Sequence, residues 1–170
     1  MRRKKRGAVA LAAAALVGVV VVSVNVLPSA AQDPPPPIAA EFLTGRAVFT
    51  DAIHMKIKIK MDGKMRVVGV KDPSTTLVAR YTVQPGAQFP WHSHAGPVVV
   101  NVVEGELVYV PAETCTEHSY PAGTAFVDPG QGHVHTAFNP TDKPTVFVAT
   151  FFDAPASGPL LIPAEPADCS

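Results

Sequence analysis

The chain has 170 residues, of which 47% are apolar and 16% are charged, so it is long enough and apolar enough to bury the core of one compact domain. The formal net charge is zero, but residues 1–31 hold five basic residues and no acidic one, which leaves nine basic against fourteen acidic residues in 32–170, a net charge of −5. This mildly acidic balance, without a basic cluster, excludes nucleic acid as an expected partner.

The N-terminal segment has the order of an export signal. Residues 2–6 are all basic, residues 7–27 carry no charge, and small residues follow up to Ala31. A basic head, an apolar stretch and a small-residue cleavage site are typical of a secretory signal peptide, so we predict a signal at 1–31 and a secreted or extracytoplasmic domain. The apolar stretch is also long enough to cross a bilayer, which leaves an uncleaved membrane anchor as the alternative.

Composition also predicts the domain boundaries. The proline run within residues 32–40 is expected to form a stiff, extended spacer. We place a β-barrel domain at 41–153. Residues 154–170, rich in proline and alanine, are expected to form an irregular C-terminal tail.

The barrel region has the patterns of short β-strands. Apolar and polar residues alternate over 53–61, and Asp62-Gly63 offers a tight turn, so residues 53–70 are predicted to form a β-hairpin. Further runs of β-branched and aromatic residues predict strands at 77–84, 98–103, 106–111, 124–127, 133–138 and 145–152. Nothing between them has a helical period, which favours an all-β, antiparallel sandwich or barrel.

The two cysteines, Cys115 and Cys169, both lie in the part predicted to be exported. Because that compartment is oxidising, we expect one disulfide that ties the tail to the segment around Cys115. Two free thiols are the alternative.

Two His-x-His pairs mark candidate metal ligands. His92 and His94 leave the same face of an extended strand, and His133 and His135 repeat this spacing near the end of the barrel region. A single pair is more often a packing or surface feature, but two pairs at strand starts favour a shared metal site.

The stretches around these pairs resemble the two sequence signatures of the cupin family. The residues that match the first signature are Gly86, His92, His94 and Gly105. Those that match the second are Gly123, Pro129, Gly132, His135 and Asn139. More narrowly, the layout of signal, spacer, single domain and late cysteines resembles small secreted single-domain cupins of actinobacteria.

The resemblance implies an antiparallel jelly-roll β-barrel whose interior holds a divalent transition metal, with His92, His94 and His135 as ligands. His133 is an alternative fourth ligand, or else a rim histidine in water. Iron, manganese, nickel, copper and zinc are all compatible with this set.

The sequence departs from the family pattern at two places. Val98 stands where the family has a glutamate ligand, and neither Glu104 nor Glu106 is expected to replace it. One extra residue separates Pro129 from Gly132, which would alter the loop that leads to His135. The missing glutamate leaves two alternatives: a three-histidine site, as some cupin dioxygenases have, or a barrel with weakened metal binding.

The predicted function is metal binding, with a dioxygenase-type reaction on a small organic substrate as one hypothesis and a non-catalytic module that binds a small ligand or a metal as the alternative. An isomerase of sugar-like substrates has less support, because no set of basic residues surrounds the site. The expected partner is a small molecule. A homodimer is an open alternative, and a membrane is expected only if the signal segment is uncleaved.

Overall fold

The structure is a computed structural model that describes residues 36–71 and 75–169. The predicted signal peptide (1–31), the first part of the predicted spacer (32–35) and Ser170 lie outside the described residues. Within the described ranges every regular element is a β-strand, and none of these residues forms a helix that could cross a membrane.

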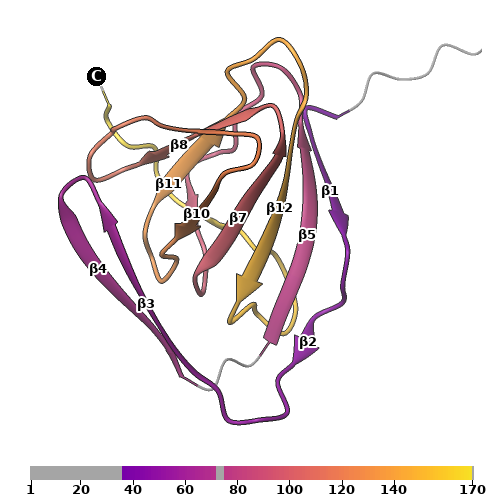
Figure 1. The fold of residues 1–170 in the computed structure, drawn as a ribbon, viewed down its shortest axis with the longest axis vertical. Helices are drawn as coiled ribbons and strands as arrows, with labels where there is room; N and C mark the ends of the chain where they lie inside the picture. Colours follow the sequence, from indigo (N-terminus) through magenta and orange to yellow (C-terminus); the bar gives the residue numbers. More distant parts are fainter. Residues whose placement is uncertain (1–35, 72–74, 170) are drawn as a thin grey trace, which may run out of the picture. The chain divides into compact units, whose positions relative to one another are not determined.

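Two antiparallel sheets form the barrel, and a two-stranded hairpin is separate from them (Figure 1). The larger sheet has the order β1 (Ile38–Phe42), β5 (Thr75–Val83), β12 (Thr145–Phe152), β7 (Val98–Glu104) and β10 (Ala125–Asp128), with β2 (Ala47–Val48) paired to β5. The smaller sheet has the order β13 (Ile162–Pro163), β6 (His92–Ser93), β11 (His135–Phe138), β8 (Glu106–Pro111) and β9 (His118–Pro121). The predicted all-β, antiparallel jelly-roll is confirmed.

The core lies between the inner faces of the two sheets. Every second residue of β5 and β12 is buried, because alternate side chains of a strand point to opposite faces. Tyr81 of β5 stacks on Phe147 of β12 with ring centroids 5.0 Å apart, and Tyr109 of β8 contacts Phe126 of β10 across the two sheets at 4.9 Å. These apolar residues form one continuous cluster, whose burial is the main favourable term for folding.

The predicted hairpin forms a separate two-stranded sheet of β3 (His54–Met61) and β4 (Lys64–Lys71). Asp62 and Gly63 at its turn both have positive φ, as a two-residue hairpin turn of this hand requires. The hairpin is tied to the turn that follows β8, where Arg66 pairs with Glu113 and Thr114 Oγ1 donates to Asp62 Oδ2 at 2.9 Å.

Strand boundaries differ from the sequence-based expectation at several places. β1 begins at Ile38, three residues before the expected start of the barrel, and pairs with β5. β6 and β13 have only two residues each, too few for an alternating pattern to be recognised in the sequence. β11 begins at His135, so His133 lies in the preceding loop and not on the strand.

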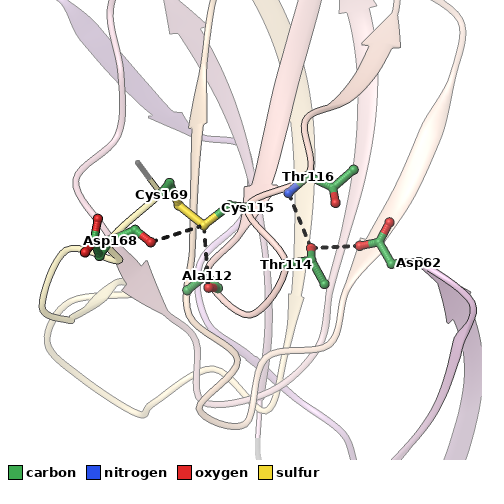
Figure 2. The surroundings of a disulfide bond; sticks show 7 residues. All are labelled: Asp62, Ala112, Thr114, Cys115, Thr116, Asp168 and Cys169. Atoms are coloured by element: carbon green, nitrogen blue, oxygen red, sulfur yellow. Dashed lines mark hydrogen bonds between the residues drawn. A yellow bond between two sulfur atoms is a disulfide. The ribbon is translucent and has the colours of Figure 1, made fainter.

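The C-terminal tail is attached to the barrel by pairing and by a covalent bond. Cys169 forms the expected disulfide with Cys115 (Figure 2). Before that, β13 pairs with β6, and the amide of Ala164 donates to the carbonyl of Trp91 at 3.0 Å. The tail is therefore part of the fold, with a short strand in a segment whose composition predicted irregular structure.

We predict that removal of the disulfide lowers the stability of the protein. The bond joins residues 54 positions apart, and in the chain-entropy model a loop of that length corresponds to about 4 kcal/mol of stabilisation. Urea unfolding of a Cys115→Ser, Cys169→Ser double variant should show this loss against the oxidised wild type. An unchanged unfolding midpoint would contradict the expectation.

A second prediction concerns Asn139, which is fully buried and follows β11 directly. Its amide nitrogen donates to the carbonyls of Val83 and Lys143 at 2.9 and 2.7 Å, and its oxygen accepts from the amide and hydroxyl of Thr141. Asn139→Ala leaves these groups unpaired, so we expect the free energy of unfolding to fall by roughly 2–4 kcal/mol in urea titrations. Asn101→Ala, at an exposed position of β7, is the matched control and should change it by less than about 0.5 kcal/mol.

Candidate metal centre

Three histidines from two paired strands meet inside the barrel. His92 opens β6, His94 follows that strand, and His135 opens β11 directly opposite His92 in the antiparallel pairing. The ring centroids are 4.3 Å apart for His92 and His135, 4.8 Å for His92 and His94, and 5.3 Å for His94 and His135. All three side chains are buried, and one nitrogen of each lies within 4.8 Å of the other two.

Backbone carbonyls orient these imidazoles. His92 Nδ1 lies 2.7 Å from the carbonyl oxygen of Pro90, and His94 Nδ1 lies 2.9 Å from that of Leu160 in the tail. His135 Nδ1 makes a longer contact of 3.4 Å with the carbonyl oxygen of His133. Because a carbonyl only accepts, each Nδ1 carries the proton, and the Nε2 lone pair is left to bind a metal ion.

Burial keeps the three histidines neutral near pH 7. Desolvation lowers the pKa of His92 and of His135 to about 4, and it lowers the pKa of His94 as well. Since a metal binds the neutral form of imidazole, no proton has to be displaced from these nitrogens at neutral pH. The donor set therefore fits a divalent transition metal.

A small apolar cavity of about 40 Å³ lies beside the histidines. Aromatic and aliphatic side chains from both sheets and from the tail line it, among them Tyr81, Phe89, Val98, Phe147, Phe151 and Leu161. Pockets that hold drug-sized molecules enclose roughly 300–1,000 Å³, so in this state the cavity has room only for very small molecules.

Asp128, at the end of β10, is a site residue that the sequence reasoning missed. It is 1% exposed, and its Oδ1 accepts a hydrogen bond from the hydroxyl of Tyr109 at 3.0 Å. The same oxygen lies 3.4 Å from His133 Nδ1 and 3.5 Å from His135 Nδ1. Its Oδ2 lies 3.8 Å from His94 Nε2 and has no hydrogen-bond partner.

The charge state of Asp128 follows from these contacts. Burial alone raises the pKa of its carboxyl, but the contacts with His133, His135, His94 and Tyr109 outweigh burial and hold the pKa below its ordinary value. One sequence signal could have identified it: Asp128 is two residues from Phe126, so on a strand both side chains point to the same, buried face.

The structure also places the remaining residues that the sequence analysis considered as ligands. His133 contacts Tyr109 and Asp128 and lies outside the group formed by His92, His94 and His135. It forms instead a second group with Asp128 and His135 that could hold a metal ion. It also lines an open groove of about 430 Å³ beside the hairpin. Val98 stands at the position where the family pattern has a glutamate. Its side chain is 2% exposed and lines the cavity. Of the two nearby acids, Glu104 is exposed, and Glu106 accepts from Ser119 on the neighbouring strand.

The extra residue between Pro129 and Gly132 is accommodated within the loop. Gly130, Gln131 and Gly132 all have positive φ, and the amide of Gln131 donates to the carbonyl of His94 at 2.8 Å. A β-carbon at position 130 would lie 1.9 Å from the carbonyl oxygen of Gly96, so only glycine fits there. The tight loop leaves His135 opposite His92.

Comparisons with known proteins agree with this architecture. The model of the family described as "Cupin domain" matches residues 79–151. A search of curated protein sequences returned no match.

Three solved structures are similar to part of this chain. The polyketide cyclase RemF from Streptomyces resistomycificus is 17% identical over 55% of this chain and 63% of its own, with a TM-score of 0.46. KdgF from Halomonas sp. is 17% identical over 72% of this chain and 85% of its own, also with a TM-score of 0.46. A sugar phosphate isomerase from a cupin superfamily, from Silicibacter pomeroyi, is 30% identical over 45% of this chain and half of its own, with a TM-score of 0.40.

We predict that the metal-free protein loses stability in acid. The pKa of His92 and of His135 is about 4 in the folded protein, below the ordinary value of 6.5, so the unfolded chain binds more protons between these limits. The free energy of unfolding should therefore fall as the pH decreases from about 6.5 to 4, by on the order of 3 kcal/mol for each histidine once it is fully protonated.

Thermal melts in a chelating buffer measure this effect. A His92→Gln, His135→Gln double variant should show a flatter dependence of Tm on pH, whereas His54→Gln, at an exposed position of β3, should behave as the wild type does. A wild-type Tm that stays constant from pH 7 to pH 4 would contradict the prediction.

Proposed function

We propose that this protein, in which residues 79–151 match the model of the family described as "Cupin domain", binds one divalent transition metal in its barrel through His92, His94 and His135. The observation that carries the proposal is the set of three buried imidazoles whose Nδ1 atoms all face carbonyl oxygens. Such contacts fix the ring orientation and tautomer of metal-binding histidines.

The chemistry of the donors supports a first-row metal. Neutral imidazole suits iron, nickel, copper and zinc, and three such ligands leave coordination positions open for water or a small molecule. A metal held there would supply Lewis acidity and, for iron, nickel or copper, redox chemistry. The aromatic walls of the cavity exclude bulk water from this place.

The reaction that fits best is a dioxygenase-type oxidation of a small organic compound. A dioxygenase adds both atoms of O₂ to its substrate, so no separate reductant is required. The cavity admits a molecule as small as O₂, but an organic substrate needs more space. Leu161 of the tail lines the cavity, so this segment forms part of the wall that would meet an organic substrate.

A non-catalytic module is the second candidate, and the small volume of the cavity favours it. A barrel that only holds a metal or a very small ligand needs no space for an organic substrate. Oxygen uptake with a panel of small organic compounds separates the two candidates, because only an enzyme consumes O₂ in proportion to added substrate.

Export from the cytoplasm belongs to the same proposal. The basic head and apolar stretch of residues 1–31 support it, as does the pairing of Cys115 with Cys169, which is typical of oxidising compartments. The acidic balance of residues 32–170 supports a small molecule, and not nucleic acid, as the partner.

We expect the protein, purified without a histidine tag or added metal, to contain close to one equivalent of a first-row metal by elemental mass spectrometry. A His92→Ala, His94→Ala double variant should lose it, because a single remaining imidazole holds a divalent ion only weakly. His54→Ala is the matched control and should retain the metal, since position 54 is exposed on β3.

Circular dichroism must show that both variants keep their β-structure. A folded wild type that contains no metal, and takes up none after reconstitution with iron, manganese, nickel, copper or zinc, would overturn the proposal.

A further inference from the structure

The carboxylate of Asp128 has one oxygen without a protein partner in the interior of the barrel. The side chain is 1% exposed and lines the cavity beside the histidines. Tyr109 satisfies Oδ1, while Oδ2 accepts no hydrogen bond. An unpaired carboxylate oxygen inside a protein is costly, so its presence points to a bound group that completes it.

The local charge balance identifies the kind of group that is missing. Within the described residues, the ion-pair partners of Asp128 are all histidines: His94, His133 and His135. His133 and His135 contact Oδ1, whereas His94 Nε2 lies 3.8 Å from Oδ2, which is beyond hydrogen-bond distance. A divalent cation in contact with Oδ2 would satisfy this oxygen.

Distances place Oδ2 close to the proposed metal site. It lies 3.8 Å from His94 Nε2. Asp128 also forms, with His133 and His135, a second group that could hold a metal ion, and His135 is common to this group and the three-histidine group. Two atoms that each bind one ion at about 2.1 Å lie no more than about 4.2 Å apart. The carboxylate and His94 can therefore contact the same ion.

The strand pairing explains how a carboxylate comes to lie there. Asp128 of β10 is the direct antiparallel partner of Val98 on β7, and directly paired residues have their side chains on the same face of a sheet. Both side chains line the cavity. The barrel thus has an acidic side chain one strand away from the position at which the sequence lacks one.

We propose that Asp128 is the fourth protein ligand of the metal, bound through Oδ2 together with His92, His94 and His135. This inference rests on the proposed metal site. Tyr109 acts as a positioning residue, because its hydrogen bond to Oδ1 holds the carboxylate with Oδ2 toward His94. A site of three imidazoles and one carboxylate favours divalent iron, manganese or zinc over monovalent copper, which prefers softer ligands.

Cobalt(II) is the spectroscopic probe for this inference, because its visible absorption reports both binding and coordination. The apoprotein is titrated with cobalt(II), and its zinc affinity is then measured by competition against the cobalt form. Asp128→Asn keeps the size of the side chain and an oxygen that can accept from Tyr109. We expect it to bind both metals at least 10- to 100-fold more weakly and to change the cobalt spectrum.

Two further variants sharpen the test. Asp142→Asn makes the same charge change at an exposed position in the loop before β12 and should leave affinity and spectrum unchanged. Val98→Glu in the Asp128→Asn background returns a carboxylate from the paired strand, and it should recover most of the lost affinity. A general loss of structure would not be reversed in this way.

The outcomes separate this inference from the function on which it rests. If the wild type binds cobalt and Asp128→Asn matches its affinity and spectrum, Asp128 is not a ligand, while the three-histidine site stands. If the wild type binds neither metal, the proposed metal site fails and the inference falls with it. If Asp128→Asn does not fold, Asp128→Glu replaces it: an altered cobalt spectrum supports ligation, and an unaltered one overturns it.

Discussion

The antiparallel pairing of β6 with β11 is the constraint on which the candidate site depends. It consists of a single residue pair, His92 opposite His135, and it joins two stretches of chain that are far apart in the sequence. Because His94 follows β6 directly, this one pair brings three imidazoles together. The rest of the smaller sheet holds the pair in place: β8 pairs with β11 on one side, and β13 of the tail pairs with β6 on the other.

Burial gives these histidines their chemical character. In water an imidazole is partly protonated near neutral pH, whereas desolvation in the barrel favours its neutral, metal-binding form. The same low polarity makes the carboxylate of Asp128 costly unless a cation balances it. The arrangement of neutral donors with one buried acid is therefore one that could hold a metal ion.

The tail contributes a wall of this site as well as stability. The carbonyl of Leu160 orients His94, and Leu161 lines the cavity. Residues that follow the last long strand therefore form part of the site. The disulfide between Cys115 and Cys169 anchors the end of this segment to the smaller sheet. Covalent anchoring matters here because a strand of two residues contributes little pairing energy of its own.

The sequence by itself determined the all-β class, the long strands and the three histidines. The alternation of apolar and polar residues, the turn residues and the His-x-His spacing are local patterns, which can be recognised without knowing how the strands pair. It did not reveal Asp128, which reads as an ordinary turn residue before Pro129. Only the tertiary structure decided that this carboxylate faces His94 and that the tail closes the cavity. Both facts depend on which strands pair and in which register. Strands of two residues, such as β6 and β13, are too short to show an alternating pattern, so their pairing could not be inferred from the sequence.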